Sequence, residues 1–167
     1  MGVRCVNLGR LTTVTVVERN DTVLNPPEVT EYRYDLAGNL AEERLPNGVV
    51  SDYDYDEMNR LVQLKVFEDD DADWLHGGGE DLLAEYAYEL ALDGKRTAIA
   101  ETDSDGVATS VDWFYDNLDR LVEEDCDYDT SATTEADYVA KYVYDLVGNR
   151  LRKTVDHLDA AGVDETI

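Results

Sequence analysis

The chain has 167 residues, 43% of them hydrophobic, which is enough for a modest core. Its 39 Asp and Glu residues against 14 Lys and Arg give a formal net charge of −25, a field that repels nucleic-acid phosphates and anionic membrane surfaces. No apolar run reaches the roughly 18 residues of a membrane-spanning helix, and no signal peptide follows Met1. We therefore expect no nucleic-acid partner and no membrane insertion, and we interpret the charge as a solubilising surface.

The first signal near the N-terminus is Gly9-Arg10-Leu11, which matches the second half of a unit that recurs along the chain. Cys5 then stands where the second tyrosine of that unit belongs. Because Cys5 and Cys126 form no metal-binding or redox spacing, we predict free thiols. The stretch 158–167 indicates a turn and the start of a strand. We expect a fragment of a longer repeat array, with partial units at both ends.

The unit is complete from residue 32 onward: two aromatic residues at i and i+2, an Asp, two variable residues, then two turn residues. Side chains at i and i+2 share one face of a strand, and sheets favour aromatic residues. Gly, Asn and Asp tolerate a positive φ, so the unit predicts a hairpin. The residues that carry it are Tyr32, Tyr34, Asp35, Gly38 and Asn39; Tyr53, Tyr55, Asp56, Asn59 and Arg60; Tyr86, Tyr88 and Gly94 in a weaker copy; Trp113, Tyr115, Asp116 and Arg120; and Tyr142, Tyr144, Asp145, Gly148 and Asn149.

Further turns link one hairpin to the next, at Pro46-Asn47-Gly48 and at Asp105-Gly106. Two longer links, at about 67–80 and 127–137, are predicted to be insertion loops. Residues 80–88 are the one stretch whose pattern suggests a helix, but their C-terminal end belongs to a repeat strand. The predicted fold is therefore all-β, with about ten strands in about six tandem antiparallel hairpins. These form a twisted, curved sheet in a single repeat region over 1–167.

The tyrosines of successive hairpins are expected to stack in register, each cross-strand pair contributing roughly 0.2–1 kcal/mol. Their i, i+2 spacing shows that each pair shares a face of the sheet, but not which face is exposed to solvent. Exposed tyrosines would stack on sugar rings, whereas buried ones are core. We prefer the core interpretation, since large aromatic side chains dominate burial energetics.

Other residue patterns that suggest chemistry have simpler structural explanations. Asp103, Asp105 and Asp112, with Glu101 and Gly106, resemble an EF-hand calcium loop. The same residues form a linking turn without evident flanking helices, so we predict no metal site. The Asp that recurs in each unit predicts turn capping rather than paired-carboxylate catalysis. His76-Gly-Gly-Gly lacks the nucleophile elbow that it would serve in an esterase. We predict no catalytic residue and no cofactor.

The Tyr-x-Tyr-Asp-x-x-Gly-Asn/Arg-Leu pattern, repeated at least five times over most of residues 4–167, resembles the YD repeats of bacterial RHS and wall-associated proteins and of teneurins. That resemblance implies a long twisted sheet that spirals into a hollow shell. In bacterial toxins of this type the shell encloses a C-terminal toxic domain. Other members present surfaces for adhesion, and such repeats are often described as carbohydrate-binding.

One family feature is missing: no Asp-Pro occurs in the chain, so the Asp-Pro-x-Gly-type segment that closes the shell and releases the toxin is not carried over. The resemblance thus implies a non-enzymatic scaffold, a shell segment that encloses or presents a toxin or effector domain. The alternative is a cell-surface adhesion or carbohydrate-binding module. The expected partners are other YD repeats of the parent chain, a toxin or effector domain, and a glycan under the alternative. The expected location is secreted or on the cell surface of a bacterium.

Overall fold

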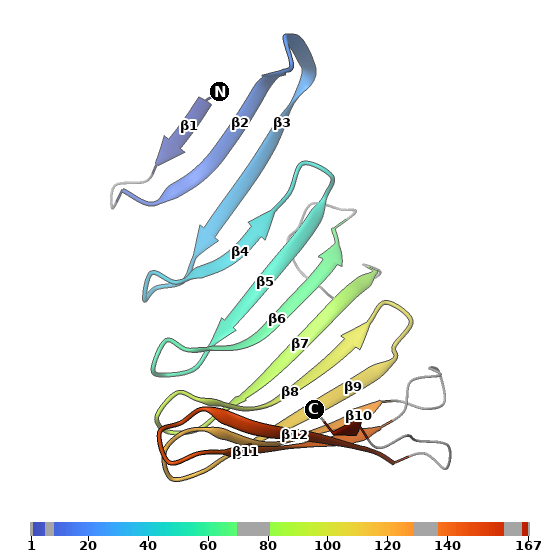
Figure 1. The fold of residues 1–167 in the computed structure, drawn as a ribbon. Coiled ribbons are helices and arrows are strands. Elements are labelled where there is room, and N and C mark those ends of the chain that lie inside the picture. The colour runs from blue at the N-terminus through green and yellow to red at the C-terminus, as the bar shows by residue number, and fades with distance from the viewer. Residues whose placement is uncertain (1, 6–8, 70–80, 129–136, 159–164, 167) are drawn as a thin grey trace. The chain divides into compact units, whose positions relative to one another are not determined.

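The computed structural model describes residues 2–5, 9–69, 81–128, 137–158 and 165–166 (Figure 1). Those residues form strands and turns and no helix, so the all-β prediction is confirmed. No helix in this part of the chain is long and apolar enough to cross a membrane. The strands number thirteen in the described residues, more than the roughly ten expected.

The contacts divide the chain into two compact units, Met1–Glu85 and Tyr86–Ile167. The strands of the first unit are β1 (Gly2–Cys5), β2 (Leu11–Arg19), β3 (Thr22–Tyr34), β4 (Leu40–Arg44), β5 (Val49–Tyr55) and β6 (Leu61–Glu68). The boundary falls within β7 (Leu82–Leu90). The second unit continues with β8 (Arg96–Asp103), β9 (Ala108–Tyr115), β10 (Leu121–Tyr128), β11 (Tyr138–Tyr144), β12 (Arg150–His157) and β13 (Glu165–Thr166).

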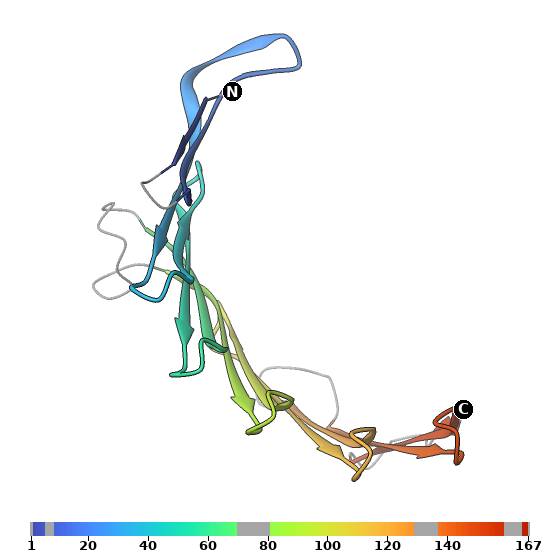
Figure 2. The same cartoon turned by 90° about the vertical axis from the view of Figure 1, so that its left-hand side faces the viewer.

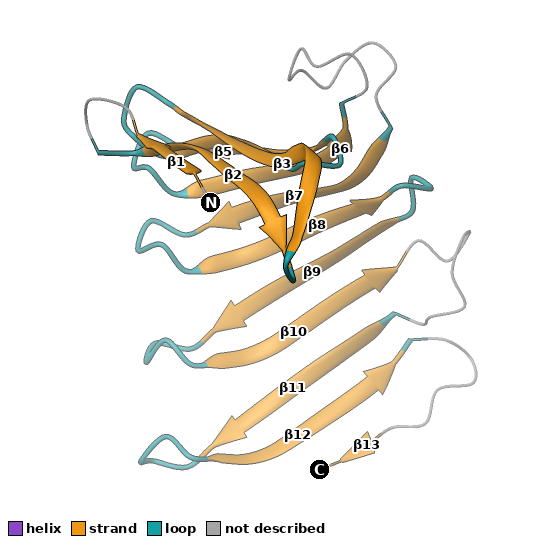
Figure 3. Ribbon diagram, turned by 90° about the horizontal axis from the view of Figure 1, so that it is seen from above, coloured by secondary structure: helices purple, strands orange, loops and turns teal. Residues whose placement is uncertain are grey.

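Within each unit every strand pairs antiparallel with the next strand along the chain, from β1 to β6 and from β8 to β13 (Figure 3). In each unit, taken by itself, the strands lie in a single layer, seen edge-on in Figure 2. The predicted arrangement of tandem antiparallel hairpins is therefore confirmed. Residues 82–88 of the stretch whose pattern suggested a helix lie in strand β7.

The strand register has the same irregularity at each complete YD unit. Tyr34 faces Leu40 after a shift between Arg33 and Tyr34, and Tyr144 faces Arg150 after a matching shift. The backbone of Cys5 has this position too, facing Leu11 after a shift. This register agrees with the prediction that Cys5 replaces a tyrosine, although its side chain lies outside the described part of the structure.

Each strand presents alternate residues to two faces of the layer. One, which we call the aromatic face, carries the tyrosines of the repeats. The other, which we call the charged face, carries cross-strand ion pairs such as Arg33 with Glu42 at 3.0 Å and Lys141 with Glu123 at 3.8 Å. The aromatic side chains are half-buried, whereas the residue between the two aromatics of a pair, such as Arg33 or Phe114, is exposed. The shared face is as predicted, but the tyrosines are not a closed core.

Full burial is confined to a few apolar side chains. In the first unit Val50 and Phe67 are completely buried and face each other across β5 and β6. In the second unit Cys126 and Ala140 are buried on adjacent strands. The Cys126 thiol is free, as expected, and its pKa is raised by burial. A single layer leaves few positions with neighbours on every side, which explains the small core.

The expected insertion loops are described only at their roots. Phe67 and Glu68 end β6, and residues 70–80 lie outside the described residues, as do 129–136 between β10 and β11. At the first root, the Asp69 carboxylate is fully buried, with its Oδ2 3.5 Å from the Arg44 guanidinium. The Asp69 amide donates to the Gly48 carbonyl at 3.1 Å. The Pro46-Asn47-Gly48 turn therefore closes over this root.

Candidate functional site

The hairpin turns between the paired strands share one backbone pattern. In the first complete unit, the Asp35 amide donates to the Asn39 carbonyl at 3.0 Å and the Gly38 amide donates to the Asp35 carbonyl at 3.2 Å. The same two bonds occur in the turns that begin at Asp56, Ala91, Asp116 and Asp145. The fourth residue has a positive φ in every case: Gly38, Asn59, Gly94, Asp119 and Gly148. Only Gly, Asn and Asp adopt that conformation readily, which explains the alternation seen in the sequence.

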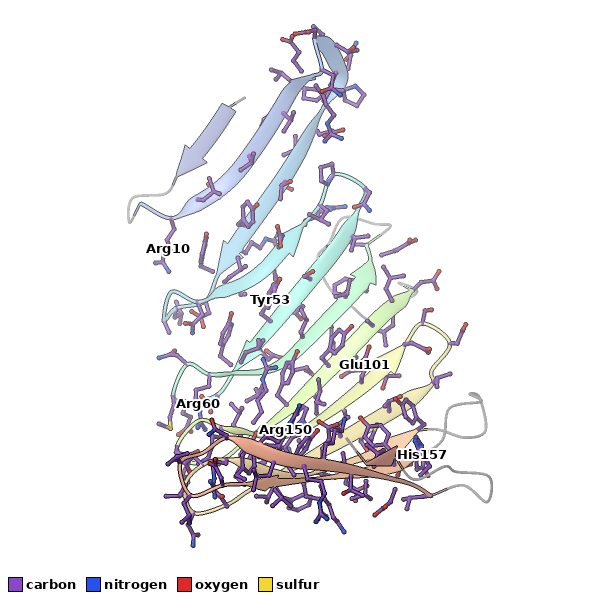
Figure 4. All side chains as sticks on the ribbon, viewed as in Figure 1. Arg10, Tyr53, Arg60, Glu101, Arg150 and His157 are labelled. Atoms are coloured by element: carbon purple, nitrogen blue, oxygen red, sulfur yellow. The ribbon has the colours of Figure 1, made fainter. Side chains whose placement is uncertain are left out.

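The aspartate that opens four of these turns caps the turn with both carboxylate oxygens. In the turn at 116–120, Asp116 Oδ1 accepts from the Arg120 amide at 3.0 Å and Oδ2 accepts from Arg120 Nε at 2.7 Å. Asp145 makes the matching pair with Asn149, at 2.8 and 2.9 Å. Asp35 pairs in this way with Asn39 and Asp56 with Arg60 (Arg60 is labelled in Figure 4). The Arg120 side-chain bond lowers the pKa of Asp116, and the Asn149 bond lowers that of Asp145.

The second tyrosine of a unit ties its hairpin to the hairpin before it. Tyr55 Oη donates to the carbonyl of Leu40, the first residue of β4, at 3.0 Å. Tyr144 Oη donates to the carbonyl of Leu121, the first residue of β10, at 2.7 Å. Tyr34 and Tyr115 make the same bond to Leu11 and Arg96. Each tie reaches the strand that leaves the preceding turn, so successive turns are connected through tyrosine.

The fifth turn residue adds a second connection when it is basic. The Arg120 guanidinium lies 4.9 Å from the ring centre of Tyr144, and its Nη1 donates to the Asp145 carbonyl at 3.1 Å. Lys95 lies over Tyr115 and pairs with Asp119 in the next turn. Arg10, labelled in Figure 4, lies 5.3 Å from the centre of Tyr34. Where this residue is Asn39, its side-chain Nδ2 donates to Oδ1 of Asn59 in the next turn at 2.9 Å.

The weaker copy at 86–95 differs from the alignment expected from the sequence. Its turn begins at Ala91, since the Ala91 amide donates to the Lys95 carbonyl at 2.8 Å. Leu90 therefore has the place of the second tyrosine, and Tyr88 has the place of the first. The Arg96 guanidinium over Tyr88, at 4.4 Å, matches Arg150 near Tyr142 at 5.8 Å and supports this shift. The Gly at 94, four residues after Leu90, was the sequence signal for the true register.

Two linking turns show that the pattern is not confined to YD units, since the Leu45 and Asp103 amides donate to the Val49 and Val107 carbonyls at 2.8 and 3.1 Å. Asp103 opens the linking turn at 103–107, and its Oδ1 accepts from the Asp105 and Val107 amides at 2.9 Å each. The β2–β3 hairpin turns at Asn20 and Asp21, both with a positive φ. That two-residue turn was missed, although Asn-Asp between two strand-like runs is a signal for it.

The three candidate calcium ligands belong to two different elements of the structure. Asp103 and Asp105 form the linking turn, while Asp112 lies in β9 opposite Ala98 and Asp125. Among the described residues, no three His, Cys, Asp or Glu side chains are grouped as a metal site would require. In the first unit an open cavity of about 670 Å³ lies between the turns at 35–39 and 56–60. Its lining includes Tyr53, Tyr55, Glu42, Asp52 and Asp54.

Glutamates on the aromatic face accept hydrogen bonds from aromatic side chains. Glu124 accepts from Trp113 Nε1 at 3.1 Å and from Tyr138 Oη at 2.9 Å. Burial, together with Glu124, raises the pKa of Tyr138. Burial and the neighbouring Glu43 likewise raise the pKa of Tyr32, and burial and Glu101, labelled in Figure 4, raise that of Tyr86. These carboxylates satisfy the polar ends of the aromatic side chains, a structural role.

The RHS Repeat family model matches residues 34–67, from the second tyrosine of one unit to the end of β6 in the next. No curated protein matches the chain. Among solved structures, TcdB2-TccC3-TEV is similar with a TM-score of 0.63 and 17% identity, over 96% of this chain and 9% of that chain. The Tc holotoxin pore of Photorhabdus luminescens has a TM-score of 0.57 and 18% identity over the same shares. At these identities the likeness is one of fold.

Proposed function

Because residues 34–67 are an RHS repeat and the fold resembles Tc toxin chains, we propose that the chain is a non-enzymatic segment of an RHS shell that encloses or presents a C-terminal toxin or effector domain. The proposal assigns it no catalytic residue and no cofactor. Its partners are then other repeats of the parent chain and the enclosed domain. The protein would be a bacterial one, secreted or displayed at the cell surface.

The observation that carries the proposal is the tie between hairpins. A hydroxyl from the end of one hairpin bonds to the first strand residue after the preceding turn, as Tyr34, Tyr55, Tyr115 and Tyr144 each do. Such a tie needs only the neighbouring hairpin, so it can be repeated indefinitely. Each hairpin contacts its sequence neighbours, which is the construction principle of repeat arrays and suits a long wall.

The names of the similar solved structures support a toxin or effector domain as the proposed cargo. Both are of Tc toxin complexes that contain TccC3, and this chain corresponds to 9% of the length of each matched chain. A wall of many such segments is consistent with that share. The small buried core and the half-buried aromatic face also suit a wall better than a globular catalytic domain.

The proposal is tested first by sequencing the parent reading frame on both sides of the chain. We expect more YD units, then an Asp-Pro-x-Gly-type segment and a compositionally distinct domain. The intact parent is then treated with protease, beside a variant in which the predicted Asp-Pro-x-Gly closure is deleted. The C-terminal domain should resist cleavage in the closed parent and be digested in the variant. Equal digestion in both would refute enclosure.

The alternative, a carbohydrate-binding or adhesion module, makes a different prediction on the same protein. The half-buried aromatic face, with Trp113 beside Glu124, would bind sugars saturably. Binding on a glycan array, lost on Trp113→Ala and kept on Phe114→Ala on the opposite face, would favour this function. A parent with a wall-binding region and no distinct C-terminal domain would point the same way.

A further inference from the structure

The turns of the second unit carry large apolar side chains at their tips. We call residues 91–96, 116–120 and 145–150 the turn edge. Leu92 is 93% exposed and Leu118 is 71% exposed, while Leu146 is fully exposed beside Val147. Single exposed leucines are ordinary on a protein surface. Here one recurs in every YD turn, at the second position for Leu92 and Leu146 and at the third for Leu118, and the turns of the first unit have Leu36 and Met58 at these positions.

No turn hydrogen bond explains these leucines. The two variable turn positions contribute only backbone amides to the cap, as Leu118 and Val147 do by donating to Asp116 and Asp145. Any residue could supply that amide, and a polar side chain would cost less in water. Repeated apolar tips therefore indicate a surface that another chain covers.

The turn edge also differs in charge from the rest of its unit. Residues 86–167 contain 20 acidic and 7 basic residues. The turn edge contains equal numbers of acidic and basic residues, four of each. The acidic residues are Asp93, Asp116, Asp119 and Asp145, and the basic residues are Lys95, Arg96, Arg120 and Arg150. Contacts such as Lys95 with Asp119 and Arg120 with Asp116 neutralise these charges locally. The remaining surface repels another copy of the chain, whereas the turn edge does not.

The spacing of the apolar turn tips further restricts which partner could cover them. One hairpin advances two strands, so the turns that carry the apolar tips recur about every 10 Å along the edge. A partner must offer apolar side chains at that same interval to cover them together. A second copy of the same edge does so by construction, because two identical rows match when related by a two-fold axis.

We propose that the turn edge of the second unit is a self-complementary contact surface whose occupant is the turn edge of a second copy of this chain. The leucine tips of the two copies interdigitate where the charge of each is locally balanced. The contact involves few side chains, so it is weak and reversible between separate chains. It would become effective where repeats are held at high local concentration. This proposal does not depend on the shell function and stands or fails separately from it.

The test is sedimentation velocity of the chain under reducing conditions, over a wide range of protein concentration. We expect the weight-average sedimentation coefficient to rise reversibly with concentration. In the triple variant Leu92→Ser, Leu118→Ser, Leu146→Ser, self-association should weaken by about tenfold or more, because the apolar contact is lost. The matched control is Val23→Ser with Leu158→Ser, two exposed apolar residues outside the turn edge, which should associate like the unchanged chain. Circular dichroism checks that both variants remain folded.

Salt separates this contact from an ionic one. Raising NaCl to 0.5 M should strengthen association between turn edges, since it screens repulsion elsewhere on the surface. Association that weakens with salt would indicate that the basic residues of one copy meet an acidic surface of another, and would overturn the proposal. It would also be overturned by a chain that stays monomeric throughout, or by a triple variant that associates as the unchanged chain does.

Discussion

Single atoms of the repeat have separable roles, and the tyrosine hydroxyl is the clearest. Tyr144 Oη bonds to the Leu121 carbonyl at 2.7 Å. Tyr142 shares the same face and the same strand, and among the described residues no hydrogen bond is seen for its hydroxyl. The ring of each tyrosine packs in the layer, but only one hydroxyl connects two hairpins.

Removing the Tyr144 hydroxyl should therefore destabilise the protein while removing that of Tyr142 should not. We expect Tyr144→Phe to lower the free energy of unfolding by about 0.5–1.5 kcal/mol, since the Leu121 carbonyl loses a donor. Tyr142→Phe, measured by the same urea titration, should change it by only a few tenths of a kcal/mol. Equal effects would mean that the tie contributes no stability.

Glycine at the fourth turn position is required by conformation rather than by space. A Cβ added at Gly148 meets nothing within 4 Å, yet its φ is +96°. We expect Gly148→Ala to lower the unfolding free energy by about 1–2 kcal/mol because an ordinary residue is strained there. Gly148→Asn should cost less, since Asn59 adopts this conformation in its own turn. Thermal unfolding of both variants checks the order, and an alanine variant as stable as the native chain would contradict it.

Paired strands show one arrangement that works against stability. Glu42 of β4 and Asp52 of β5 face each other directly on the charged face. Burial raises the pKa of Asp52, and the carboxylates of Asp54 and Glu42 raise it further. Like charges in direct cross-strand positions are destabilising, and Lys65 on the other side of Asp52 offsets only part of this.

Asp52→Asn should accordingly stabilise the protein near neutral pH, by about 0.2–1 kcal/mol. The pH dependence follows from the raised pKa: the folded native chain protonates Asp52 before the unfolded chain does, so its disadvantage fades as pH falls through that pKa. The gain from Asp52→Asn should shrink in the same range. Because the Asp54 carboxylate also raises the pKa of Asp52, Asp54→Asn should stabilise the protein in the same direction and bring the pKa of Asp52 down. Urea titrations at several pH values decide this, and a gain that persists unchanged in acid would be inconsistent with it.

Across the whole molecule, the net charge of −25 sets the response to salt. Self-repulsion of this size destabilises the folded state, and salt screens it. We expect the melting temperature to rise by several degrees between about 20 mM and 1 M NaCl. The rise should be similar in KCl, since screening does not depend on the identity of the cation. A large rise at micromolar Ca²⁺ alone would instead indicate a specific calcium site and revive the interpretation of Asp103, Asp105 and Asp112 as ligands.

Local residue chemistry was sufficient to predict the hairpins from the sequence. The positive-φ residues, the capping Asp and the aromatic pairs at i and i+2 act over two to five positions, so they are legible without the fold. That is why the all-β antiparallel arrangement and the shared face of Tyr32 and Tyr34 were foreseen. The Asn20-Asp21 turn was legible in the same way but was overlooked.

Tertiary structure alone decided what joins one hairpin to the next. The ties from Tyr34 and Tyr144 reach carbonyls 23 residues away, and their partners depend on how neighbouring strands are registered. Register also moved the weak unit, placing Leu90 where Tyr88 was expected, because two alternate residues satisfy the same strand pattern. The half-buried state of the tyrosines and the row of exposed turn leucines follow from a single-layer sheet. A sequence specifies which residues share a face, but only packing determines what covers that face.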